Sequence, residues 1–157
     1  MANTVFEVIQ ANTTHVAVIA PLFDSYRQFY GQTTDLLQAH NFLLERLTKQ
    51  ESVILIAVAH NTLNCLGFAQ LYPAFSSVAM QRIWILNDLF VASKARNSGV
   101  GTALLNGVKA FATATNAQRI ALATAIDNYP AQKLYEKVGY TKNQAFEHYQ
   151  LTLSNYS

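Results

Sequence analysis

The residues with the clearest capacity for chemistry form a short loop at positions 96–102, Arg-Asn-Ser-Gly-Val-Gly-Thr. This loop follows a strand-like apolar run at 82–91 and precedes a helix-like run that begins near Thr102. Two glycines at a strand-to-helix junction leave backbone N–H groups exposed at a helix N-terminus, where the helix dipole also favours negative charge. The loop therefore predicts a phosphate-binding site.

The spacing of the two glycines excludes two common nucleotide motifs. A P-loop requires Lys after its last glycine, and no Lys follows Gly101. The dinucleotide fingerprint requires a third small residue where Leu104 stands. A glycine-rich helix start without any ligand is the structural alternative to a phosphate site.

Three segments together resemble the GNAT superfamily of N-acetyltransferases. Arg96, Gly99 and Gly101 fit the Arg/Gln-x-x-Gly-x-Gly loop that binds the acyl-CoA pyrophosphate in that family. Residues 85–91, Ile-Leu-Asn-Asp-Leu-Phe-Val, resemble its central strand, and residues 127–140 resemble its Asn-x-x-Ala-x-x-x-Tyr-x-x-x-Gly-Tyr segment. The three segments occur in the family's order over about residues 82–153, and residues 23–30 are similar to the first helix of members related to polyamine, thialysine and histone-type enzymes.

The resemblance implies transfer of acetyl from acetyl-CoA to a primary amine in a ternary complex, without a covalent enzyme intermediate. By resemblance, backbone groups of the strand end would align the donor, and the loop would surround its pyrophosphate. Arg96 would either contact phosphate or hold the preceding turn, and Asn97 stands where relatives usually carry Gly. The implied cofactor-binding residues are Leu89, Phe90, Val91, Arg96, Asn97, Ser98, Gly99, Val100, Gly101, Thr102 and Asn128.

Tyr135 is the candidate catalytic residue. Its place on an apolar helix stripe, taken alone, indicates a core tyrosine. The resemblance implies instead a general acid whose hydroxyl lies near the CoA sulfur. Asn128, just before that helix, is expected to cap it as well as to contact the cofactor.

The residues that would bind the acceptor amine are less clearly defined. Tyr30, Asn87 and Asp88 are the candidate substrate residues. Polyamine-specific relatives often carry Glu where this chain has Asn87, so the general base stays open between a side chain and water. In a regular strand Asp88 would face away from Asn87. The acceptor is expected to be a small amine, a polyamine or a lysine-like amino acid. The alternatives are a protein lysine or N-terminal amine, or a non-catalytic acyl-CoA-binding module.

Composition and motifs argue against several other classes of protein. A net charge of +2 without a Lys/Arg run gives no support to a nucleic-acid surface, and no apolar run is long enough to span a membrane. The four histidines lack metal-ligand spacing and no Gly-x-Ser-x-Gly elbow occurs, so we expect neither a metal nor a serine nucleophile. The single cysteine, Cys65, and the absence of a basic, then apolar N-terminal segment predict a cytoplasmic protein.

The pattern of elements predicts an α/β fold, α+β in some schemes. Strands are expected at 5–9, 53–59, 65–71, 82–91, 119–124 and 148–153, and helices from about 14, from Asp35, after Gly101 and over 130–138. This is the GNAT arrangement that the resemblance implies: one domain over 1–157, with a mixed, mostly antiparallel sheet of six to seven strands and about four helices. Apolar and aromatic residues at 146–153, together with the frequent dimers of that family, predict a homodimer through the C-terminal region.

Overall fold

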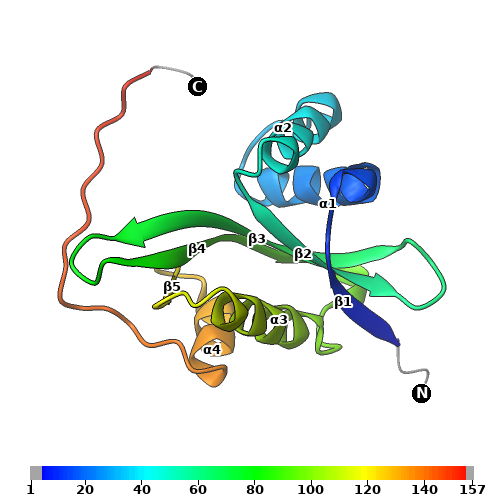
Figure 1. The fold of residues 1–157 in the computed structure, drawn as a ribbon. Coiled ribbons are helices and arrows are strands. Elements are labelled where there is room, and N and C mark those ends of the chain that lie inside the picture. The colour runs from blue at the N-terminus through cyan, green and yellow to red at the C-terminus, as the bar shows by residue number, and fades with distance from the viewer. Residues whose placement is uncertain (1–4, 155–157) are drawn as a thin grey trace.

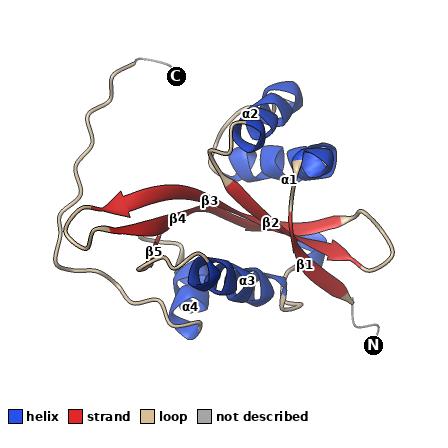
Figure 2. Cartoon of the chain, in the orientation of Figure 1, coloured by secondary structure: helices blue, strands red, loops and turns tan. Residues whose placement is uncertain are grey.

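A computed structural model describes residues 5–154 and shows one sheet between two layers of helices (Figures 1 and 2). The strands are β1 Phe6–Gln10, β2 Val53–Ala59, β3 Cys65–Ser76, β4 Gln81–Val91 and β5 Ile120–Ala121. The helices are α1 Val16–Phe29, α2 Leu36–Thr48, α3 Val100–Ala114 and α4 Tyr129–Lys137, with short 3-10 turns η1 Thr13–His15 and η2 Ser93–Ala95. Within the described residues, no helix is long and apolar enough to cross a bilayer.

The sheet has the order β1-β2-β3-β4-β5, antiparallel throughout except for the parallel pair β4 and β5. This confirms the α+β class and the mixed, mostly antiparallel sheet. The predicted number of six to seven strands is too high, because the described residues form five. The predicted strand at 119–124 pairs only at Ile120 and Ala121, and the one predicted at 148–153 forms no strand.

The continuous apolar run of β2 explains the two layers. Ile54, Ile56 and Val58 pack in one core with α1 and α2, and the alternate Leu55 and Ala57 pack in a second core with α3. Because successive side chains of a strand point to opposite faces, a strand with both faces covered must be apolar at every position. In Figure 1, α1 and α2 cover one face of the sheet and α3 and α4 the other.

Several predicted helix ends are confirmed. The Asp35 side chain accepts a hydrogen bond from the Gln38 N–H at the start of α2, at 3.0 Å. Gly139 follows α4 with φ +106°, a conformation that glycine adopts without a Cβ clash. Strand β3 runs beyond the predicted Leu71 and through Pro73 to Ser76, where it forms a long hairpin with β4.

Candidate active site

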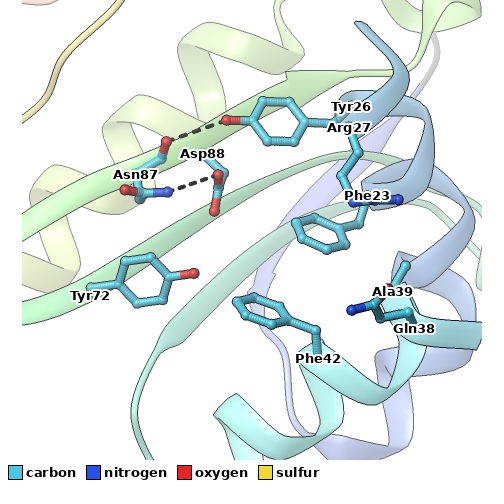
Figure 3. Close-up of a pocket in the computed structure, with 9 residues that line it drawn as sticks. All are labelled: Phe23, Tyr26, Arg27, Gln38, Ala39, Phe42, Tyr72, Asn87 and Asp88. Carbon is cyan, nitrogen blue, oxygen red and sulfur yellow. Dashed lines mark hydrogen bonds between the residues drawn. The ribbon is translucent and has the colours of Figure 1, made fainter. Parts of the chain in front are cut away.

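A bulge in β4 determines how the acceptor-side residues point. Gln70 of β3 pairs with Asp88, but the next residue, Leu71, pairs with Leu86, so Asn87 is an extra residue in β4. The prediction that Asp88 faces away from Asn87 assumed a regular strand and is wrong. The bulge lets both residues line the same cleft (Figure 3).

This cleft has a volume of about 320 Å³ and lies between α1, α2 and the β3–β4 pair. Aromatic rings from three elements form much of its wall, and its polar groups come from α1, α2, β3 and the bulge (Figure 3). Phe23 and Phe42 stack with ring centroids 5.8 Å apart, which joins α1 to α2 at the wall. The lining residues are Phe23, Tyr26, Arg27, Gln38, Ala39, Phe42, Tyr72, Asn87 and Asp88.

Asp88 places a carboxylate in this aromatic cleft, with only 5% of the residue exposed. Its Oδ2 accepts a hydrogen bond from Gln70 Nε2 at 2.7 Å, and its Oδ1 accepts one from Asn87 Nδ2 at 3.1 Å. Burial, and then the charge of Asp88, raise the pKa of Tyr72 to about 12 and raise the pKa of Tyr26 as well. Both phenols are therefore neutral hydrogen-bond donors at physiological pH.

Strands β4 and β5 stop pairing just before the bulge at Asn87. They pair only at Trp84 with Ile120 and at Ile85 with Ala121. Beyond that point, residues 86–91 have no strand of the described chain on the β5 side. The Asn87 and Val91 carbonyls accept hydrogen bonds from the Tyr26 hydroxyl and Arg96 Nε. The rest of this edge has no partner strand, as an extended ligand along Leu89, Phe90 and Val91, which the resemblance implied, would require. Side chains of Leu89 and Val91 pack in the α3 core, and Phe90 packs in the α1–α2 core.

The predicted phosphate loop has the conformation that an anion site needs. Asn97 and Gly99 both have left-handed φ values, 63° and 86°, so Asn97 adopts the conformation for which relatives use glycine. Gly99 is the N-cap of α3 and faces open space, since no atom lies within 4 Å of a Cβ built there. The first intrahelical hydrogen bond of α3 is donated by the Ala103 N–H to the Gly99 carbonyl oxygen, at 3.0 Å. The N–H groups of Val100, Gly101 and Thr102 therefore have no intrahelical acceptor and are available for an anion.

Two other loop residues hold its shape. Ser98 Oγ donates to the Ala95 carbonyl oxygen. Arg96 Nε donates to the Val91 carbonyl oxygen at 3.2 Å, and the guanidinium lies 5.4 Å from the centre of the Phe90 ring. Of the two roles predicted for Arg96, holding the turn is therefore observed, and phosphate contact stays a prediction.

Gly101 is a point of close packing between elements. A Cβ at this position would lie 3.1 Å from Leu134 Cδ2 of α4 and 3.8 Å from Val91 Cγ2 of β4. The loop, the end of β4 and α4, which contain the three segments that resemble the family, therefore meet here. Any side chain at position 101 would therefore require the Leu134 side chain to move by a few tenths of an ångström.

Helix α4 positions Tyr135 at this convergence. The Asn128 side chain accepts a hydrogen bond from the Ala131 N–H at 3.3 Å, which confirms the predicted cap. The Tyr135 ring packs edge-on against Tyr140, with centroids 5.8 Å apart. Burial, and then the nearby Tyr30, raise the pKa of Tyr135 to about 12. Tyr30, at the end of α1, is 51% exposed and packs on Tyr26, outside the described lining of the cleft.

Within residues 5–154, no group of three or more His, Cys, Asp or Glu side chains is arranged to hold a metal ion. Cys65 is part-buried, and burial raises the pKa of its thiol to about 11.

Comparison with known proteins identifies the family. The sequence profile of the acetyltransferase (GNAT) family matches residues 19–140. YhfO of Bacillus subtilis, described as an uncharacterized N-acetyltransferase, is 49% identical over 92% of this chain and 95% of its own length. A probable acetyltransferase of Haemophilus influenzae is 32% identical over 94% of this chain and 99% of its own length. The chain belongs to the GNAT family of acetyltransferases, and it is an acyltransferase.

The same fold is found in a solved structure. The crystal structure of a probable acetyltransferase has a TM-score of 0.91 and 43% identity, and the alignment covers 95% of this chain and 99% of that one.

The sequence interpretation missed most of the acceptor cleft. Residues 23–30 were recognised as similar to the family's first helix, but only Tyr30 among them was a candidate substrate residue, and Phe42, Tyr72 and Gln70 were not recognised. An available signal was the density of aromatic residues on the first helix, at positions 23, 26, 29 and 30, which exceeds what one buried stripe needs. The position of Tyr72 depends on the β3–β4 register, which no local pattern specifies.

Proposed function

We propose that this enzyme transfers acetyl from acetyl-CoA to a small primary amine by direct attack in a ternary complex. The observation that supports this most is the position of the β4 bulge. On one side of it lies an aromatic cleft with a buried carboxylate, and beside it lies the free edge of β4 that leads to the helix α3 loop. An amine in the cleft and a thioester along β4 would meet at the bulge.

Each group of residues has a defined task in this proposal. The N–H groups of the loop and of the α3 N-terminus bind the pyrophosphate. The backbone at Leu89, Phe90 and Val91 aligns the donor, and Asn128 contacts it from α4. Asp88 attracts a cationic amine, and the rings of Phe23, Phe42 and Tyr72 contact its alkyl or aryl part.

The amine must lose a proton before its nitrogen attacks the thioester carbon. Asp88, directly or through a water held near Asn87, is the candidate acceptor of that proton. The proton lost by the ammonium before attack passes through this acceptor to solvent. As the new C–N bond forms and the C–S bond breaks, the nitrogen loses a second proton, which balances the one gained by the CoA sulfur.

Tyr135 stabilises the departing thiolate. A thiol has a reference pKa near 8.5, whereas the pKa of Tyr135 is about 12, so the phenol keeps its proton more strongly than a thiol would. Tyr135 therefore acts mainly by donating a hydrogen bond as charge develops on sulfur, and the released amine proton completes the thiol.

A small acceptor fits the cleft better than a protein segment, because the cleft volume is about 320 Å³ and aromatic rings close its sides. Its one carboxylate matches one ammonium group. Arg27, the cationic residue of its lining, is paired with Asp24 at 3.0 Å. We propose that residues 1–157 act as a single catalytic domain, as a homodimer, in the cytoplasm, and without a metal.

The test combines binding with turnover. Acetyl-CoA is expected to raise the melting temperature of the protein, and free thiol is expected to appear with at least one amine of a broad panel of monoamines, polyamines, amino acids and lysine peptides. A protein stabilised by acetyl-CoA but inactive with every amine would be the non-catalytic module. A protein that acetylates only peptides would contradict the small-amine acceptor.

A further inference from the structure

Tyr26 reaches from helix α1 to the bulge of β4. It lines the acceptor cleft, and its hydroxyl donates a hydrogen bond to the main-chain carbonyl oxygen of Asn87 at 3.4 Å (Figure 3). Asn87 is the extra residue of the bulge and lies in the part of β4 that β5 does not pair with. The hydroxyl therefore lies where the cleft meets the unpaired part of β4.

Four aromatic rings hold the side chain of Tyr26 in place. Its ring packs edge-on against Phe68 and Phe90, with centroids 5.7 Å apart in both pairs, and against Tyr30, at 5.2 Å. The Phe23 ring stacks on it at 6.3 Å. Phe68 has no exposed surface, and Phe90 belongs to the end of β4 that is proposed to align the donor. Since these contacts restrict the ring, the hydroxyl has a fixed position at the bulge.

The surroundings of the Tyr26 hydroxyl keep it protonated. Burial raises its pKa most, followed by the nearby Asp88 carboxylate and then by the phenols of Tyr30 and Tyr135. Asp88 belongs to the acceptor cleft and Tyr135 to the proposed donor side, so groups from both sides act on this hydroxyl. Its single proton is donated to the Asn87 carbonyl oxygen. The phenol oxygen therefore offers its lone pairs to an N–H group in the cleft.

The Asp88 carboxylate is held in place in a similar way. Gln70 Nε2 donates to its Oδ2 at 2.7 Å, and Asn87 Nδ2 donates to its Oδ1 at 3.1 Å. Each carboxylate oxygen has a further lone pair, so Asp88 can accept an amine N–H in addition to these two bonds. The cleft therefore offers two fixed hydrogen-bond acceptors of different kinds, a carboxylate and a phenol oxygen.

We propose that Tyr26 positions the attacking nitrogen, because its phenol oxygen accepts one N–H of the acceptor amine while the Asp88 carboxylate accepts the other. This inference rests on the proposed acetyl transfer. A neutral primary amine has two N–H groups and one lone pair, so two acceptors in the cleft leave the lone pair free to point to the thioester along β4. In an N-methyl amine a methyl group replaces one N–H, and one of the two acceptors loses its partner. Tyr26 therefore makes the cleft selective for primary over secondary amines.

The test compares the best primary amine of the panel with its N-methyl derivative. In the wild type we expect kcat/KM for the primary amine to be at least about tenfold higher than for the N-methyl amine. Tyr26→Phe removes the hydroxyl and keeps the ring, and we expect it to lower this ratio at least about fivefold, through a loss with the primary amine. Tyr149→Phe is the same substitution at a residue that is 93% exposed and outside the cleft lining, and it should leave the ratio unchanged.

The ratio distinguishes a contact with nitrogen from a purely structural role. If Tyr26 only supports the bulge, Tyr26→Phe should lower kcat/KM for both amines by the same factor, and the unchanged ratio would overturn the inference. A wild type that uses both amines equally well would overturn it too. Circular dichroism and the melting-temperature shift caused by acetyl-CoA check that the variant folds and binds the donor. A wild type that acetylates no amine would overturn the proposed function itself, and this inference with it.

Discussion

At the scale of single residues, the proposed mechanism assigns Tyr135 and Asp88 to two sides of β4. Tyr135 packs against the core that contains α3, near Gly101, whereas Asp88 lines the cleft between the sheet and helices α1 and α2. The two residues can therefore be tested independently, one against the departing thiolate and the other against the amine.

Tyr135→Phe removes one hydroxyl and keeps the ring that packs on Tyr140. We expect kcat to fall about a hundredfold or more, with little change in the acetyl-CoA KM, because the hydrogen bond matters most as thiolate charge develops. Steady-state kinetics with the best amine, under conditions where chemistry limits turnover, is the measurement. If the variant keeps more than about half of the wild-type kcat, Tyr135 is a core tyrosine.

Asp88→Asn removes the carboxylate charge in the cleft while keeping its size. A hydrogen bond to a charged group contributes about 1.5–3 kcal/mol, so we expect kcat/KM for the amine to fall about 10- to 100-fold. The melting-temperature shift caused by acetyl-CoA should be unchanged. Asp127→Asn, outside the cleft lining, is the control. Equal losses in both variants would remove Asp88 from acceptor binding.

At the scale of elements, the packing of α4 against α3 joins the helix that carries Tyr135 to the loop proposed to bind the donor. A Cβ on Gly101 would lie 3.1 Å from Leu134 Cδ2, tighter than normal contact. We expect Gly101→Val to displace α4 and raise the acetyl-CoA KM at least about tenfold, which corresponds to about 1.4 kcal/mol.

A second-site variant distinguishes two possible reasons for glycine at position 101, the packing of α4 and the close approach of phosphate. If α4 packing is the cause, Leu134→Ala should restore much of the affinity lost in Gly101→Ala, because it removes the contacting methyl group. If phosphate approach is the cause, the double variant should bind no better than the single one. Acetyl-CoA titration by calorimetry measures both.

A second connection between elements, made by the Asp24 carboxylate, joins α1 to the loop before α2. Asp24 is buried and accepts hydrogen bonds from the Asp35 N–H, the Thr34 hydroxyl and the Arg27 guanidinium. The Asp35 N–H and the Thr34 hydroxyl are the main groups that lower the pKa of Asp24 below its usual 3.8. The carboxylate therefore stabilises the fold above about pH 4, and this contribution is lost as the pH falls through the lowered pKa.

We expect Asp24→Asn to reduce the free energy of unfolding by about 1–3 kcal/mol at pH 7, and by less below pH 3. Urea denaturation at both pH values measures the difference. A loss that is the same at both would show that the charge of Asp24 contributes nothing.

At the scale of the whole molecule, the sheet brings the proposed donor site and the proposed acceptor site to opposite sides of one strand. The pH dependence of the reaction should reflect this arrangement. An alkyl ammonium has a pKa near 10.4, so we expect kcat/KM for the amine to rise between pH 6 and 9. With its pKa near 12, Tyr135 should cause no fall in rate up to about pH 10. A descending limb near pH 8 in the wild type, absent from Tyr135→Phe, would contradict this assignment.

The sequence alone determined the features that depend on local chemistry. The glycines and Asn97 specify a left-handed loop before α3, the all-apolar β2 specifies a strand covered on both faces, and Asp35 and Asn128 specify helix starts. Each of these depends on backbone preference or periodicity within a few residues.

Only the tertiary structure decided what depends on strand register and on distant contacts. The bulge at Asn87 arises from the pairing of β4 with β3, and it turns Asp88 into the same cleft as Asn87. Likewise, the alternating pattern at 148–153 has the period of a strand, but these residues pair with no strand of the described chain and form none. Pairing partners far apart in the sequence leave no local signal, because the hydrogen bonds that define them are formed by the backbone that every residue shares.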